Sequence, residues 1–108
     1  MDEVVLVVAE NMVVFRHWCR DHDVDFRDKK FRFVNSYWDV YGWSIHYEYT
    51  LHLLVLHGGL ARIEASEYWY DQNGRHESIS PLQNALEISF HKPWDVIKAE
   101  AKAYELTY

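Results

Sequence analysis

An open α/β fold with a mostly parallel sheet is the architecture that this sequence predicts. Two predominantly apolar runs, Val4 to Ala9 and Leu51 to Leu56, are typical of strands that are buried on both faces. The first run ends at Glu10-Asn11 and passes into apolar residues at helical spacing, as in the first half of a βαβ unit. We therefore expect residues 1–108 to form a single α/β domain of two or three layers, with about four mostly parallel strands and a C-terminal helix.

The first half of the chain is expected to supply three strands. They cover residues 3–9, residues 31–36 and residues 50–59, and the last of them ends in two glycines. Asn11 is a suitable N-cap for a helix over about residues 12–22. The apolar side of this helix is expected to contain Met12, Val14, Phe15, Trp18, Cys19 and His22. Residues 37–49 are very aromatic, and they fit either a helix that begins after Ser36 or, from Ile45, a strand.

Residues 60–75 fit two alternative structures. We favour a helix that ends near Asn73, with Gly74 as its left-handed terminus. The alternative is a hairpin, because Asn-Gly also suits a tight turn. Residues 85–90 alternate between apolar and polar side chains, which predicts an edge strand. Pro93 and Asp95 suit the start of a closing helix. The apolar stripe of that helix would contain Ile97, Ala101, Tyr104 and Tyr108.

The composition narrows the class of partner. A net charge of −6, from 17 acidic and 11 basic residues, works against direct binding to nucleic acid. It favours a partner with a basic surface. Aromatic residues make up 17% of the chain, with five Trp and eight Tyr, and a core of this size cannot enclose all of them. We expect several of them in an interface.

Cys19 is the only cysteine, so an internal disulfide is excluded and a reducing compartment is expected. The acidic start of the chain lacks the basic flank of a signal peptide, and the run Val4 to Ala9 is too short to span a bilayer. These features predict a cytoplasmic protein without a membrane partner.

Ligands of open parallel sheets bind beyond the carboxyl ends of the strands. Here those ends carry polar residues or glycine, and they would line one crevice if the first strand lay between the other two. The ligand-binding candidates are Glu10, Asn11, Asn35, Ser36, Gly58 and Gly59. The turn after the first strand is not a glycine-rich phosphate loop, and Glu10 would repel a phosphate there.

Catalytic and metal-binding patterns are weak in this sequence. His17 and His22 are five residues apart, which does not place them on one helical face. None of the serines lies in a Gly-x-Ser-x-Gly elbow. We therefore expect neither an enzyme nor a protein with a bound metal or cofactor.

The opening resembles small α/β proteins encoded in bacteriophage genomes, which are mostly of unassigned role. The resemblance rests on Val4 to Arg20, with Glu10-Asn11, Phe15 and Trp18-Cys19-Arg20, then on Arg32 to Ser36 and on Gly42. It covers about the first 42 residues. It implies a phage protein that acts in an infected bacterium, and it supplies no catalytic residue.

These observations lead to a non-enzymatic binding protein that inhibits or modulates a host protein, such as a defence nuclease with a basic groove, by covering its surface. The partner-binding candidates are Asp21, Asp23, Asp25, Glu64, Glu67, Tyr68 and Trp69. The main alternative is a binder or sponge for a small ligand or nucleotide signal at the carboxyl-end crevice. A third, weaker alternative is a virion structural component, which would self-associate as a homo-oligomer.

Overall fold

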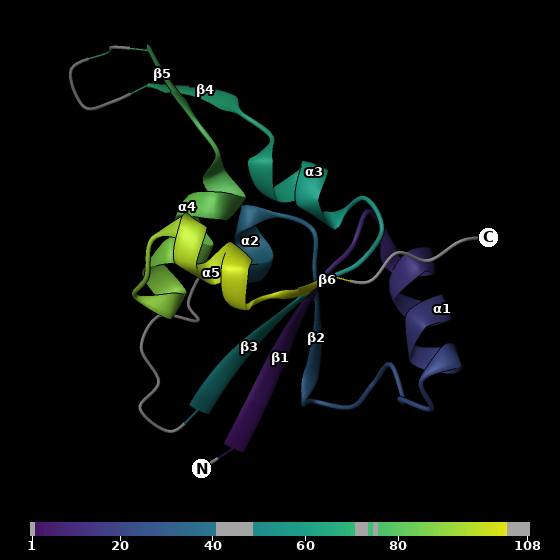
Figure 1. The fold of residues 1–108 in the computed structure, drawn as a ribbon. Coiled ribbons are helices and arrows are strands. Elements are labelled where there is room, and N and C mark those ends of the chain that lie inside the picture. The colour runs from purple at the N-terminus through teal and green to yellow at the C-terminus, as the bar shows by residue number, and fades with distance from the viewer. Residues whose placement is uncertain (1, 41–48, 71–73, 75, 104–108) are drawn as a thin grey trace.

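The core of the molecule is a four-stranded parallel sheet in the order β2-β1-β3-β6. The computed structural model describes residues 2–40, 49–70, 74 and 76–103. The strands are β1 (Asp2–Val8), β2 (Phe31–Val34), β3 (Tyr49–Val55) and β6 (Lys102–Ala103), as Figure 1 shows. The three strands expected in the first half are therefore confirmed, with β1 between β2 and β3. The fourth strand in the sheet is only the two residues of β6, which pair with Leu54 and Val55.

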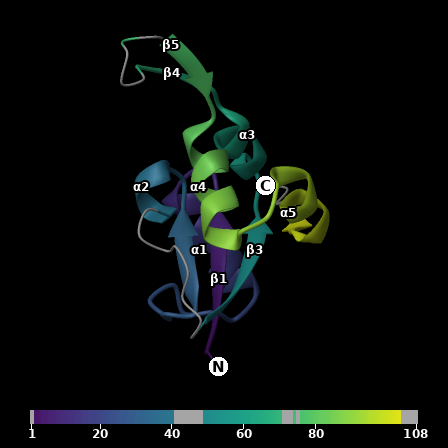
Figure 2. The same ribbon diagram turned by 90° about the vertical axis from the view of Figure 1, so that its left-hand side faces the viewer.

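Helices cover both faces of this sheet, so the domain has three layers. One face carries α1 (Met12–Asp21). The other carries α2 (Tyr37–Val40), α3 (Gly59–Glu64), α4 (Pro81–Phe90) and α5 (Trp94–Glu100), and Figure 2 shows α4 in front of the sheet with α1 behind it. Because β1 is covered on both sides, every residue from Val4 to Ala9 is buried.

Successive side chains of β1 enter two separate cores. Val5, Val7 and Ala9 pack against Val14, Phe15, Trp18 and Cys19 of α1. Val4, Leu6 and Val8 pack against apolar residues of the other four helices. Met12 and His22, at the two ends of α1, are exposed, so the expected apolar side of this helix was too wide by one residue at each end.

The strand expected at residues 85–90 is wrong, because this segment belongs to helix α4. Its buried residues Leu82, Ala85, Leu86 and Ser89 recur at helical spacing, whereas Ile88 is 61% exposed. Pro81 in the first turn also suits a helix start, since its missing amide proton has no intrahelical acceptor there. An alternation over six residues is too short to distinguish the two-residue period of a strand from the 3.6-residue period of a helix.

The helix favoured for residues 60–73 is also wrong. Helix α3 ends at Glu64, and β4 (Glu67–Tyr70) then pairs with the antiparallel β5 (His76–Ile79) in a sheet of their own. Gly74, between the strands, has a φ of 76°, so it supplies the left-handed backbone that the turn needs. In both ribbon views the hairpin projects away from the rest of the domain (Figures 1 and 2).

The closing helix is shorter than expected. It begins at Trp94 with Pro93 as its N-cap, and it ends at Glu100, where the chain passes into β6. Tyr104 and Tyr108 of the expected stripe lie outside the described residues, as do residues 41–48, where the choice between helix and strand was open.

Candidate functional site

The carboxyl ends of β1, β2 and β3 lie side by side, as the parallel order requires. The Ala9 amide donates to the Val34 carbonyl at 3.1 Å, and the Leu56 amide donates to the Val8 carbonyl at 2.8 Å. One residue further on, the Glu10 amide donates to the His57 carbonyl at 3.3 Å. The structure thus brings the six predicted ligand-binding residues to one edge of the sheet.

The two glycines at this edge have packing roles. A β-carbon on Gly59 would stand 2.4 Å from the Val8 carbonyl oxygen, so only glycine lets α3 start this close to β1. Gly58 has a φ of 74° and lies against the Glu10 side chain. These contacts explain the glycine pair without a ligand.

The polar side chains at the edge serve as caps. Asn11 Oδ1 accepts from the Val14 amide at 3.0 Å, which confirms Asn11 as the N-cap of α1. The Asp39 carboxylate accepts from the Asn35 amide, the Ser36 amide and the Ser36 hydroxyl at 3.0 to 3.2 Å. The sequence analysis missed Asp39, although Ser36 and Asp39 have the spacing of a capping box.

A cavity of about 180 Å³ opens beside the end of β2, and of the residues around it only Asn35 and Ser36 were predicted from the sequence. Trp38 is 74% exposed, and Tyr37 meets it edge to face with ring centroids 5.0 Å apart. The Arg62 side chain comes from α3, and no carboxylate of the described residues lies within ion-pair distance of it. The lining residues are Asn35, Ser36, Tyr37, Trp38, Arg62, Ala65, Pro81 and Leu82. A cavity lined by both an indole and a guanidinium group suits a planar, anionic ligand.

The predicted partner-binding residues fall at two ends of the molecule. Asp21, Asp23 and Asp25 lie at the end of α1 and in the loop after it, whereas Glu67, Tyr68 and Trp69 lie on β4. Both ribbon views place the hairpin and this loop at opposite ends (Figures 1 and 2). A single flat surface on a partner would therefore meet one group and not both.

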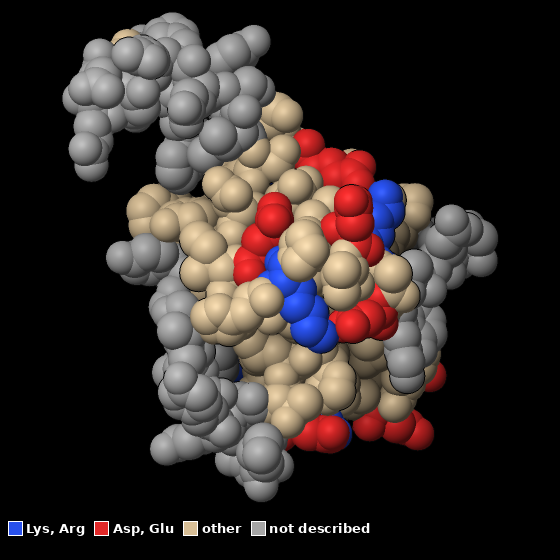
Figure 3. Space-filling view, turned by 60° about the vertical axis from the view of Figure 1, so that its left-hand side comes forward, with Lys and Arg blue, Asp and Glu red and all other residues tan. Residues whose placement is uncertain are grey.

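The face formed by α4 and α5 carries two ion pairs, and one of them joins α5 to α3. Lys98 Nζ lies 3.2 Å from Glu64 Oε1 of α3, and Lys92 Nζ lies 2.8 Å from Glu100 Oε2. Figure 3 shows acidic side chains on both sides of basic side chains on this face. All four groups are largely in solvent, so each pair contributes at most about 1 kcal/mol.

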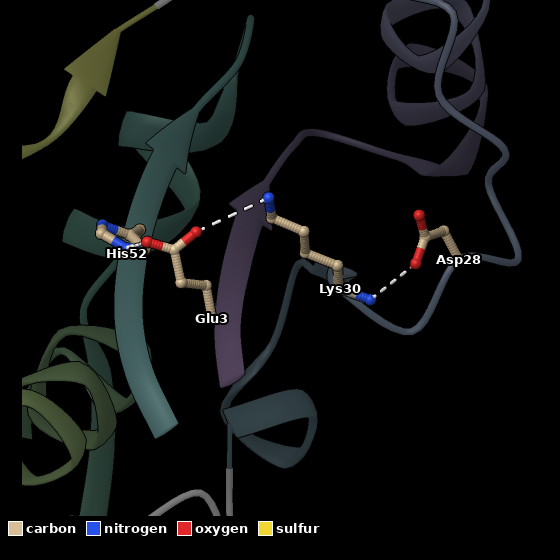
Figure 4. Close-up of polar contacts among 4 residues, drawn as sticks. All are labelled: Glu3, Asp28, Lys30 and His52. Atoms are coloured by element: carbon tan, nitrogen blue, oxygen red, sulfur yellow. Dashed lines mark hydrogen bonds and ion pairs between the residues drawn. The ribbon is translucent and has the colours of Figure 1, made fainter. Parts of the chain in front are cut away.

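A row of ionisable side chains crosses the amino-terminal end of the sheet on the α1 side. Glu3 Oε1 lies 3.5 Å from His52 Nε2, and Glu3 Oε2 lies 3.7 Å from Lys30 Nζ, so Glu3 stands between them (Figure 4). The Lys30 amide donates to Asp28 Oδ1 at 3.0 Å, which fixes the backbone of the turn before β2. The sequence analysis did not assemble this row, because it depends on the register of three strands.

Cys19 is buried against the sheet, as expected of a small apolar residue. Burial raises the pKa of its thiol, and the nearby negative charge of Asp25 raises it further. The thiol therefore stays protonated near neutral pH, and it does not have the low pKa of a nucleophilic cysteine.

Within residues 2–40, 49–70, 74 and 76–103, no three His, Cys, Asp or Glu side chains are grouped closely enough to hold a metal ion. In the same part of the chain, no helix is both long enough and apolar enough to cross a bilayer.

Comparison of the chain with protein-family models, with curated proteins and with solved structures found no match.

Proposed function

We propose that this chain is a non-enzymatic binding protein that modulates a protein of a bacterial host by covering part of its surface, as a phage-encoded inhibitor would. The observation that supports this function is the β4–β5 hairpin, which projects from the domain and forms a sheet of its own (Figure 1). Its first strand holds the predicted contact residues Glu67, Tyr68 and Trp69. On this proposal the chain works in the cytoplasm of the bacterium.

A projecting hairpin suits recognition for two physical reasons. An isolated two-stranded hairpin is only marginally stable in water, so packing on a partner would add stabilisation that it lacks alone. Tyr and Trp are also the residue types most enriched where binding energy concentrates in an interface. The net charge of −6 favours a partner with a basic surface, since charge complementarity speeds encounter.

The predicted contact residues lie at two opposite ends of the molecule, so one interface cannot include both groups. The proposed interface therefore consists of the hairpin and the adjacent Glu64. Asp21, Asp23 and Asp25 lie at the far end of the domain and are not part of it. They therefore provide a matched control that alters charge without altering the proposed contact.

The test is affinity capture from a bacterial lysate with the full chain as bait. We expect a host protein to be retained by the wild type and by the Asp21→Asn/Asp23→Asn/Asp25→Asn variant, and to be lost with Tyr68→Ala/Trp69→Ala. Added salt should release it. Equal retention by the hairpin variant would refute the proposed interface, and circular dichroism spectra of all three proteins would show whether each is folded.

A second candidate function is supported by the cavity beside Trp38 and Arg62. We infer that a planar anionic small molecule, such as a nucleotide signal, would stack on Trp38 and pair with Arg62 there. Native mass spectrometry of protein purified from bacteria would detect it as a bound mass that is lost on denaturation. The mass should be absent from Arg62→Ala, while Arg16→Ala serves as the control. Asn11 is unsuitable for this test because its side chain caps α1.

A further inference from the structure

The outer edge of β3 is only partly covered by another strand. Strand β6 pairs with β3 at Leu54 and Val55, the last two residues of that strand. Within the described part of the chain, no strand pairs with the outer edge from Tyr49 to Leu53. On its inner side, β3 pairs with β1 along its whole length.

The backbone direction shows which groups face this open edge. The Leu56 amide donates to Val8 of β1, and in a parallel strand the N–H and C=O of one residue point to the same side. The backbone N–H and C=O groups of Leu54 and His52 therefore point toward β1. Those of Leu53 and Leu51 point toward the outer edge. Since pairing with β6 begins at Leu54, the N–H and C=O of Leu51 and the N–H of Leu53 have no strand partner among the described residues.

A cavity of about 380 Å³ lies along this edge, and its two sides differ. On the side of α4 and α5 it is bounded by Phe90, Ile97 and Ala101, together with the Lys92–Glu100 ion pair. On the α1 side its polar lining is Glu3, His52 and Lys30, and its apolar lining is Val5, Phe31 and Leu54. Alternate side chains of an extended segment point to opposite sides, so one set would meet Phe90 and Ile97 and the other set would meet Glu3 and His52.

The charges around this cavity are paired among themselves. Glu3 lies between Lys30 and His52, and Lys92 lies 2.8 Å from Glu100. The two lysines thus match the two glutamates, although the whole chain carries −6. The acidic and basic side chains at this cavity therefore balance, and the occupant that complements them is electrically neutral.

We propose that the open edge of β3, between the Phe90–Ile97 wall and the Glu3–His52 wall, binds a short, neutral, extended segment of a partner protein by β-strand addition. The main-chain groups of Leu51 and Leu53 hydrogen-bond the segment. Its apolar side chains face Phe90 and Ile97, and its polar side chains face His52. Because β6 occupies the rows of Leu54 and Val55, the added strand is no longer than the stretch from Tyr49 to Leu53. This surface goes beyond the function proposed above, since it lies at the other end of the sheet from the hairpin (Figure 1).

The test is amide hydrogen exchange of the full chain, measured by NMR. In the free protein, the Leu51 and Leu53 amides should exchange faster than those of His52 and Leu54, which point toward β1. The probe is a capped synthetic pentapeptide of alternating valine and threonine, added to saturation. It should slow exchange at Leu51 and Leu53 at least about tenfold, with no change at Arg62 or on the hairpin.

The matched control is the same pentapeptide with alternate amides N-methylated on the edge that would pair with β3, which removes its donors and leaves its side chains intact. It should give no protection. Three results would overturn the proposal: protection of Leu51 and Leu53 in the free chain equal to that of His52, no protection by the unmodified peptide, or equal protection by the methylated one. Protection that arises without peptide as the protein concentration increases would make a second copy the occupant and would also overturn it.

Discussion

Gly58 lies so close to Glu10 that a β-carbon on Gly58 would stand 2.6 Å from the Glu10 β-carbon. The Glu10 amide also donates to the carbonyl of His57, the residue before Gly58. The turn after β1 and the turn after β3 are therefore packed against each other. This contact joins the ends of β1 and β3, at one part of the edge where the sequence predicted a ligand crevice.

Replacement of Gly58 by alanine should destabilise the fold more than the same change at Gly74. Both glycines have a positive φ, of 74° and 76°, so each variant loses about 1 kcal/mol from the strained left-handed backbone. Only at Gly58 does the new methyl group also meet a neighbour, which adds about 1–3 kcal/mol of overpacking. Urea denaturation should give the larger loss for Gly58→Ala. Adding Glu10→Gly should restore part of it, and equal losses at the two glycines would contradict the proposed contact.

Loss of the Asn11 side chain should weaken the start of α1. Its Oδ1 accepts from the Val14 amide, so Asn11→Ala should lower the free energy of unfolding by about 1 kcal/mol. Asn11→Asp keeps the acceptor and should remain near the wild type. Thermal unfolding followed by circular dichroism at 222 nm, the α-helix band, would measure both variants, and an aspartate variant as unstable as the alanine variant would argue against the cap.

The helical structure of residues 81–90 predicts opposite results at two neighbouring apolar positions. Leu86 is fully buried, so Leu86→Ala should cost about 2–5 kcal/mol through lost burial and the cavity left behind. Ile88 is 61% exposed, so Ile88→Ala should change stability by no more than about 0.5 kcal/mol. An edge strand would bury both side chains on the same face. Similar losses in urea denaturation would therefore favour the strand.

The raised pKa of Cys19 predicts a pH dependence in the alkaline range. Its thiol is stabilised in the protonated form by burial, and secondarily by the charge of Asp25, whereas the unfolded chain has an ordinary thiol pKa of about 8.5. This contribution is therefore complete below the unfolded pKa and is lost as the pH rises toward and through the folded pKa. Urea denaturation should show that Cys19→Ala has a smaller alkaline loss of stability than the wild type.

Labelling of Cys19 provides a second check on the same group. A thiol-reactive dye should modify the native chain more slowly than the urea-unfolded chain at the same mildly alkaline pH, since only the thiolate reacts. If the native chain were labelled as fast as the unfolded chain, the thiol would not be buried and its pKa would not be raised.

The sequence by itself determined the three long strands of the sheet, β1, β2 and β3, and the helix α1. The run from Val4 to Ala9 is apolar at every position, which only a strand covered on both faces explains, and Asn11 marks the start of the next helix. These signals are local, because they depend on neighbouring residues and their backbone hydrogen bonds. The convergence of the three strand ends also followed, since parallel strands joined by crossovers end at the same edge.

Only the tertiary structure decided the second half and the chemistry of the surfaces. The apolar pattern of residues 85–90 fits both the two-residue period of a strand and the 3.6-residue period of a helix. Packing against the rest of the domain decides between them, because Leu86 is buried and Ile88 is exposed to solvent. The cavity that Arg62 and Trp38 both line, and the row of Glu3, Lys30 and His52, join segments that are far apart in the chain. Hydrophobic periodicity can be recognised within one segment, but burial and ion pairing depend on the register between segments, which a short stretch of sequence does not specify.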